Sequence, residues 1–219
     1  MNTSALPTTS TALLLIDPYN DFLSEGGKLQ GRAKAVLDQV GTIAHMREVV
    51  SACRLAGVPV FYVPHHRSRP SDFSSWAHPT PYQLGAHRMQ LFEEGSWGAQ
   101  WHPDFVPGPQ DVMIKEHRGS SGFANTDLDI NLRQRGITHI VLIGMLANTC
   151  LETTGKFGME LGYHVTLVRD ATAAFSAEAM GVAHEINGPT YAHAILETAE
   201  LVNSLSPEVR RQADGLGNR

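Results

Sequence analysis

Two uninterrupted apolar segments place the strongest constraint on the fold of this chain. Residues 12–16 read ALLLI and end at Asp17-Pro18, and residues 140–143 read IVLI and end at Gly144. A strand with one solvated face alternates apolar and polar side chains, whereas a continuous apolar run is typical of a strand covered on both faces. Such strands belong to parallel sheets, so we expect a parallel sheet with helices on both sides.

Strand and helix patterns alternate along the rest of the chain. Further strands are expected at 58–63, 111–115 and 163–168, and the strand around 140 should begin at 139. Helices are expected at 32–55, 82–89, 127–135, 150–161, 176–186 and 191–205. This order predicts a doubly wound, mostly parallel α/β sheet, a Rossmann-like three-layer sandwich. We expect one domain over 1–219, with its core at about 12–205 and loosely held ends at 1–10 and 206–219.

The composition narrows the classes of partner. The 219 residues include 17 basic and 22 acidic ones, a net charge of −5 without a basic run, so we expect a small-molecule partner and no nucleic acid. Two cysteines in a chain of this length are no disulfide framework, and the first residues lack the charged and apolar regions of a signal peptide. We therefore expect a cytoplasmic protein that does not bind a membrane.

Three chemically active residues follow expected strands at their carboxyl ends. Asp17 follows the first strand, Lys115 ends the strand at 111–115, and Cys150 begins the helix after the strand at 139–143. Parallel strands place these ends at one edge of the sheet, which is where such folds bind ligands. A thiol at a helix N-terminus is expected to have a lowered pKa, whereas Cys53 is expected to be a packed helix residue. A nucleophile, a proton acceptor and a cation together indicate a thiol hydrolase.

Three motifs in matching order resemble the isochorismatase-like cysteine hydrolases, a family that includes nicotinamidases and N-carbamoylsarcosine amidase. They are LLLIDPYNDF at 13–22, MIKEHRGSSGFANTDLDINLRQRGI at 113–137 and GMLANTCLETTGKFGMELGYHVTLVRDA at 144–171. The resemblance implies that Asp17 exchanges the proton of Cys150 and that Lys115 stabilises the thiolate. It also implies a cis peptide bond at Met145-Leu146, with the backbone N–H groups of Leu146 and Cys150 forming an oxyanion hole.

The chain departs from the family pattern near the expected site. Tyr19 stands where many relatives have Gln, and Ala147 where they have Thr. The Asp-x-His metal motif of nicotinamidases is replaced by VPHHR at 63–67. Because adjacent side chains of an extended segment point in opposite directions, we expect His65 and His66 to bind no metal together, and we expect no cofactor.

The irregular stretch at 65–110 holds all three tryptophans of the chain. Long connections of this kind are usually lids, binding loops or interfaces. We expect the substrate to contact Tyr19, Phe22, Trp76 and Trp97, and the resemblance implies a homo-oligomer, either a dimer or a tetramer.

The sequence predicts a hydrolase that cleaves the C–N bond of a small amide, ureido or carbamoyl compound through a thioester. Two alternatives stay open. One is an isochorismatase-type hydrolase of vinyl ethers, in which Asp17 acts as a general acid and no thiol is needed. The other is a non-catalytic small-molecule-binding or redox-sensing protein, in which Cys150 is only oxidised.

Overall fold

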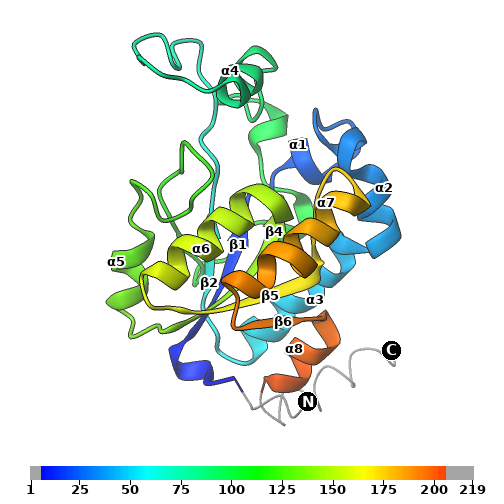
Figure 1. Ribbon diagram of the computed structural model, residues 1–219, viewed down its shortest axis with the longest axis vertical. Helices are drawn as coiled ribbons and strands as arrows, with labels where there is room; N and C mark the ends of the chain where they lie inside the picture. Colours follow the sequence, from blue (N-terminus) through cyan, green and yellow to red (C-terminus); the bar gives the residue numbers. More distant parts are fainter. Residues whose placement is uncertain (1–5, 206–219) are drawn as a thin grey trace.

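The computed structural model describes residues 6–205 and contains a six-stranded sheet in the order β3-β2-β1-β4-β5-β6 (Figure 1). Every neighbouring pair of these strands is parallel. The strands are β1 Thr11–Ile16, β2 Val60–Val63, β3 Val112–Met113, β4 His139–Met145, β5 His164–Ala173 and β6 Ala194–Leu196. The parallel, doubly wound sheet predicted from the sequence is confirmed, with β1 and β4 at its centre.

Helices cover both faces of this sheet and make three layers. The α-helices are α1 Asn20–Leu23, α2 Gln30–Val40, α3 Thr42–Leu55, α4 Pro81–Arg88, α5 Leu128–Arg133, α6 Glu152–Glu160, α7 Ala177–Gly181 and α8 Thr198–Ser204. Two π-helical turns span Ala147–Leu151 and Val182–Asn187, and short 3-10 turns span Thr8–Ser10, Trp97–Ala99, Pro103–Phe105 and Gly188–Thr190.

The side chains of β1 explain why its sequence is apolar throughout. Leu13 and Leu15 belong to the core formed with α2, α3 and α8, whereas Leu14 and Ile16 belong to the core formed with α5 and the π-helical turn before α6. Successive side chains of a strand point to opposite faces, so a central strand needs apolar residues at every position. All six residues of β1 are buried.

Two expected helices differ from the observed ones. The helix expected at 32–55 is divided at Gly41, whose φ of 71° ends α2 and precedes α3. A left-handed residue of this kind interrupts a helix, and glycine adopts it at little cost. The helix expected at 191–205 begins only at Thr198, because Ala194–Leu196 pairs with β5 as the edge strand β6.

The chain between β2 and β3 rises beyond the carboxyl ends of the strands and carries α4 (Figure 1). Two buried residues of α1 bind this segment to the body of the protein. Asn20 Nδ2 donates to the carbonyl of Trp97 at 2.9 Å, and Asp21 Oδ2 accepts from the backbone N–H of Phe92 at 2.7 Å. The segment is therefore held over the edge at which ligands bind in sheets of this type.

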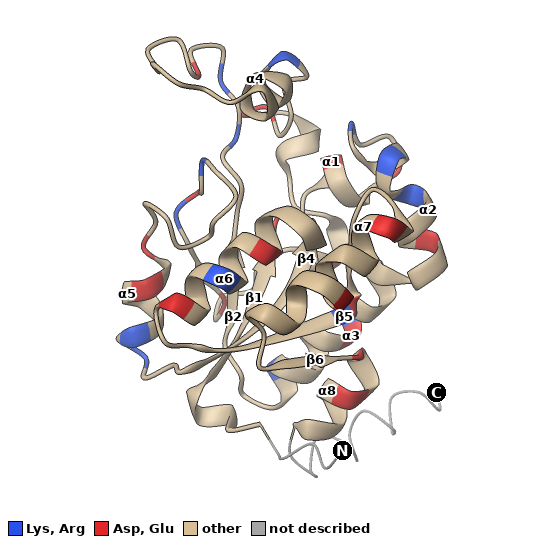
Figure 2. Ribbon diagram, in the orientation of Figure 1, with Lys and Arg blue, Asp and Glu red and all other residues tan. Residues whose placement is uncertain are grey.

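Lys and Arg are interspersed with Asp and Glu over the helices rather than gathered together in the view of Figure 2. Within residues 6–205, no helix is both long and apolar enough to cross a membrane. The loosely held start expected at 1–10 is wrong for 6–10, because Leu6 N–H donates to the Ser204 carbonyl at 3.1 Å and Thr8–Ser10 forms a 3-10 turn. The expectations for 1–5 and 206–219 lie outside the described residues.

Candidate active site

Asp17 stands at the carboxyl end of β1 in a left-handed conformation, with a φ of 53°. Its backbone N–H donates to the carbonyl of Val63 at the end of β2, and its side chain is fully buried. The chain turns sharply here because the strand ends and Pro18 follows. Asp17 is thereby placed inside the protein at the carboxyl ends of β1 and β2, rather than in the solvent.

Gly144 allows the end of β4 to approach this point closely. Its φ is 115°, and a Cβ atom there would lie 2.1 Å from the carbonyl oxygen of Ile16. Only glycine fits between the two backbones. The chain that leaves β4 therefore passes next to Asp17 before the turn that carries Cys150.

Cys150 lies in the π-helical turn Ala147–Leu151, directly before α6, and its residue is only 6% exposed. The peptide bond between Met145 and Leu146 is cis. Burial raises the pKa of the Cys150 thiol well above its usual value, and the Asp17 carboxylate raises it further. The hydroxyl of Thr149 and a backbone hydrogen bond from Leu146 oppose this shift but do not reverse it. The lowered pKa expected from the helix terminus alone was wrong, since desolvation outweighs it.

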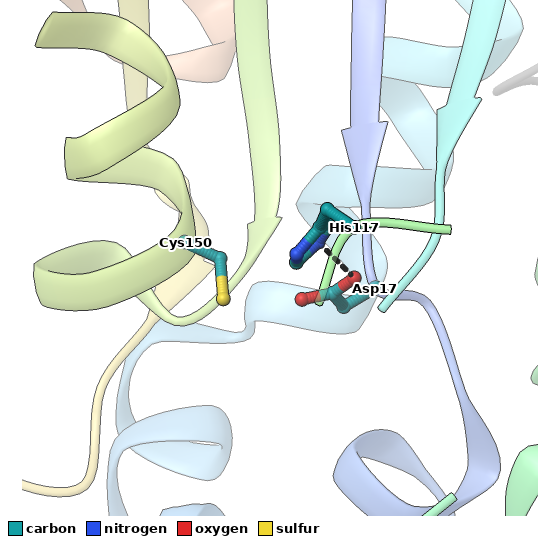
Figure 3. A group of neighbouring side chains, drawn as sticks. All are labelled: Asp17, His117 and Cys150. Carbon is teal, nitrogen blue, oxygen red and sulfur yellow. Dashed lines mark hydrogen bonds and ion pairs between the residues drawn. The ribbon is translucent and has the colours of Figure 1, made fainter. Parts of the chain in front are cut away.

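His117 is the third member of the site (Figure 3). Its Nε2 lies 3.1 Å from Asp17 Oδ1, and the two side chains are fully buried. The chain reaches this point by staying extended past β3: His117 bridges to His65 in parallel, its N–H donates to the Pro64 carbonyl, and its carbonyl accepts from His66. One ligand-type atom each from Asp17, His117 and Cys150 lies within 4.8 Å of the other two.

The charge of His117 follows from its neighbours. Burial alone would lower the pKa of His117, but the Asp17 carboxylate and the hydrogen bonds to Asp17 and to the carbonyl of Gly119 raise it more. The net pKa lies above the usual value, so the imidazolium form is favoured beside the carboxylate. Nδ1 lies 2.7 Å from the Gly119 oxygen and donates to it.

Lys115 is not part of this cluster, contrary to the expectation from the sequence. It is exposed, and its backbone N–H donates to Asp127 Oδ1 at 2.8 Å. Lys115 follows β3, which is the edge strand and is separated from β1 by β2. A side chain from this segment reaches Asp17 only beyond the end of β2, where His117 lies. His117, rather than Lys115, therefore lies beside Asp17, where the sequence predicts a lysine.

A cavity of about 180 Å³ opens onto Cys150. One of its walls comes from residues 65–91, including α4, and another comes from Arg118–Ser120. Its lining combines apolar side chains such as Phe73 and Leu91 with polar ones such as Gln83 and Arg118. Nδ1 of His87, another lining residue, is buried without a hydrogen-bond partner among the described residues. The cavity has the mixed lining of a small-molecule site, with apolar walls and a few polar groups.

The four residues expected to contact substrate are not among those that line this cavity. Tyr19 is fully buried, stacks on Trp101 with ring centroids 4.9 Å apart, and donates from its hydroxyl to the carbonyl of His65. Phe22 is buried in the core, and Trp97 is 49% exposed in a 3-10 turn. Trp76 lines an adjoining hollow that shares Gln83 and Arg118–Ser120 with the cavity. The Tyr19 hydroxyl thus holds the backbone of His65, which lines the cavity.

His65 and His66 make separate contacts. The ring of His65 lies over His117 with centroids 5.2 Å apart, and its pKa is lowered by burial and by the neighbouring His117. His66 is held between two carboxylates, with Nε2 2.7 Å from Asp72 Oδ2 and Nδ1 3.3 Å from Glu116 Oε2. Burial opposes ionisation of Glu116, but hydrogen bonds from His66 and Arg67 lower its pKa to about 2. This network fixes the cavity wall.

Comparison with known proteins agrees with this geometry. Residues 11–198 match the family model described as the isochorismatase domain. The chain belongs to the isochorismatase family. Ureidoacrylate amidohydrolase RutB of Rhizobium rhizogenes is 30% identical over 177 residues, covering 76% of this chain and 72% of the relative. RutB of Methylobacterium radiotolerans is 30% identical over 222 residues, covering 95% of this chain and 84% of the relative.

Solved structures of the family share the architecture. A cysteine hydrolase from Pseudomonas syringae has a TM-score of 0.77 at 25% identity, with 92% of this chain and 94% of that chain covered. N-carbamoylsarcosine amidase from Thermoplasma acidophilum has a TM-score of 0.63 at 26% identity, covering 86% of this chain and 96% of that chain. The isochorismatase-like fold expected from the three motifs is confirmed.

Proposed function

We propose that this protein is a cysteine-dependent hydrolase that cleaves the C–N bond of a small amide, ureido or carbamoyl compound through a thioester. Its relatives include proteins named ureidoacrylate amidohydrolase and N-carbamoylsarcosine amidase. The observation that carries the proposal is the buried group of Asp17, His117 and Cys150, because Cys150 also lines a cavity with apolar and polar walls. The group supplies a nucleophile, a proton acceptor and a cation.

The first half of the reaction acylates Cys150. Because its pKa is raised, the thiol stays protonated until substrate arrives. Asp17 then takes the thiol proton as Sγ attacks the carbonyl carbon. The oxyanion of the tetrahedral intermediate accepts hydrogen bonds from the backbone N–H groups of Leu146 and Cys150. Asp17 returns the proton to the departing nitrogen, the C–N bond breaks, and a thioester on Sγ is left.

The second half releases the acid. A water molecule gives a proton to Asp17 and attacks the thioester carbonyl, the C–S bond breaks, and Sγ recovers the proton. In both halves the Asp17 carboxylate must be ionised before the attack. His117 supports this state, because its imidazolium lies 3.1 Å from Asp17 Oδ1 and both side chains are buried. His117 would therefore perform the electrostatic part that the family pattern gives to lysine.

Replacing Cys150 tests the proposal. Cys150→Ala should lower kcat for ammonia release from a panel of small amides and ureides by on the order of 10⁴ or more, because the covalent route is lost. Mass spectrometry of wild-type protein quenched with a slow substrate should find an acyl adduct on Cys150. The control is Cys53→Ala, since Cys53 is buried in α3 and burial raises its thiol pKa to about 12.

Each rival function gives a different result. A vinyl ether hydrolase that uses Asp17 as a general acid would release no ammonia from the panel but would hydrolyse a vinyl ether, with full turnover in Cys150→Ala and none in Asp17→Asn. A non-catalytic protein would release no ammonia from any compound and form no adduct. The expected homo-oligomer, the cytoplasmic location and the independence from nucleic acid stay predictions from the sequence.

A further inference from the structure

We infer that Asp17, His117 and Cys150 also form a binding site for a thiophilic divalent cation such as Zn²⁺, and that its occupation blocks the thiol. The three side chains offer one oxygen, one nitrogen and one sulfur, and these atoms lie within 4.8 Å of one another. Zinc binds such ligands at about 2.0–2.3 Å, and three protein ligands with one open position are common in its sites. All three residues are buried, so solvent competes little for the cation.

The orientation of His117 favours this role. Its Nδ1 donates to the Gly119 carbonyl at 2.7 Å, which directs Nε2 toward Asp17 and the site. A histidine that binds a metal through one ring nitrogen almost always donates from the other to a carbonyl or carboxylate, as here. The same contact that positions His117 beside Asp17 therefore also presents a metal-binding nitrogen.

Asp17 provides a second, independent observation. Its Oδ1 faces His117, but its Oδ2 is buried and has no hydrogen-bond partner among the described residues. A buried carboxylate oxygen without a partner is costly and needs an explanation. In the proposed reaction this oxygen faces the thiol proton, and it is also a free ligand for a cation placed between Asp17 and Cys150.

The sulfur ligand decides which cations fit. Thiolate selects soft or borderline ions such as Zn²⁺ over Mg²⁺ and Ca²⁺. A cation can reach the three ligands, because Cys150 lines the 180 Å³ cavity. The histidine is equally important: a lysine ammonium in the same place carries a charge and no lone pair, so it repels a cation. With histidine where the family pattern has lysine, the three side chains can therefore bind a cation together.

Binding has a definite proton balance. The cation displaces the proton of the Cys150 thiol and the Nε2 proton of His117, releases both to solvent and forms bonds to Sγ, Nε2 and a carboxylate oxygen. Sγ is then no longer a free nucleophile, and Asp17 no longer accepts a proton. Binding does not depend on the proposed amidase activity, but the inhibition that follows from it rests on that function.

Titration with Co²⁺, a spectroscopic substitute for Zn²⁺, tests the site without turnover. Wild-type protein should show a thiolate-to-cobalt charge-transfer band in the near ultraviolet that saturates at one equivalent and disappears on adding Zn²⁺. Cys150→Ala should lose the band and Cys53→Ala should keep it. His117→Lys and His117→Gln should each weaken Co²⁺ binding at least tenfold, with folding checked by circular dichroism.

A wild-type protein without the band, or a band that survives in Cys150→Ala, overturns the site. Activity provides a separate arm: wild-type protein should be active after chelation and desalting, lose turnover with one equivalent of Zn²⁺ and recover it with chelator. A rise in turnover on adding Zn²⁺ overturns the blocking role while leaving the site intact. If no amide is a substrate, the proposed function fails, and the Co²⁺ result still decides on the cation.

Discussion

The charge of His117 should make the stability of this protein depend on pH in a defined direction. The pKa of His117 is raised in the folded state above its usual value of 6.5. The contribution of its ion pair with Asp17 is therefore complete below about pH 6.5 and is lost as the pH rises through the folded-state pKa. We expect the difference in unfolding free energy between wild type and His117→Gln to shrink from about pH 6 to about pH 9.

Urea denaturation at the two pH values measures this difference, and His117→Lys is the matched control. Its ammonium stays charged at both pH values, so its advantage over His117→Gln should hardly change. A gap between wild type and His117→Gln that stays constant or widens toward high pH would show that His117 is neutral in the folded protein.

At the same scale, Asp17 and Cys150 could be predicted from the sequence, whereas His117 could not. Asp17 directly follows β1 and Cys150 lies in the first turn after β4, and the apolar runs of these two central strands are unmistakable. The edge strand β3 has only two residues, and the chain remains extended beyond it, so the position that reaches the site depends on the pairing of His117 with His65. Lys115 is nearer to the strand but faces away, and the sequence contains no sign of this.

At the scale of elements, the close approach of β1 and β4 depends on Gly144. In Gly144→Ala the new methyl group would overlap the backbone of Ile16, which no side-chain rotation relieves. We expect a loss of stability well above the roughly 1–3 kcal/mol of left-handed strain alone, together with a fall in kcat, because Cys150 is displaced from Asp17. Gly136→Ala is the control, since Gly136 has a φ of 66° but nothing within 4 Å of the added atom.

Urea midpoints of the two variants compare these effects directly. Gly136→Ala reports the cost of the backbone conformation, and the excess in Gly144→Ala reports the contact between the strands. Equal midpoints would mean that β4 can move away from β1 without loss, which is incompatible with a site assembled by their packing.

The central elements were predictable because each carries its own local signal. Strands covered on both faces have continuous apolar runs, and Ser176, whose Oγ accepts from the N–H of Ala179, begins a helix as expected. The errors arose where tertiary contacts decide. The three residues of β6 form a strand only because β5 offers a free edge, and an isolated Ala-Ile-Leu fits a helix equally well.

At the scale of the whole molecule, the cavity joins segments that are distant in the sequence. Its walls come from 65–91 and 118–120, and its floor includes Cys150. The sequence indicates that the irregular segment serves the site, but the residues chosen from it, Trp76 and Trp97, do not line the cavity. Tryptophan was taken as a sign of substrate contact, yet the side chains facing the cavity depend on how Asn20 and Asp21 hold the segment, which no local pattern reveals.

Substitutions on α4 and the following segment should show which residues contact substrate, because only residues that line the cavity should affect KM. Tyr82 lines the cavity. Desolvation, followed by the negative charges of Cys150 and Asp17, raises the pKa of Tyr82 to about 12, so its hydroxyl lies near the site. Tyr82→Ala should raise KM by roughly tenfold or more, the effect of losing about 1–3 kcal/mol of contact in a pocket. Because Tyr82 is 59% exposed, its loss should hardly change the urea midpoint.

Trp97→Ala is the matched control, because Trp97 is also a half-exposed aromatic residue of this segment but does not line the cavity. Steady-state kinetics with the best substrate from the amide panel should show an unchanged KM for Trp97→Ala beside the raised KM for Tyr82→Ala. The reverse pattern would place substrate against the tryptophan-bearing turn instead. In that case substrate would reach Cys150 from the side of the segment that carries Trp97. The wall formed by α4 would then cover the site without contacting substrate.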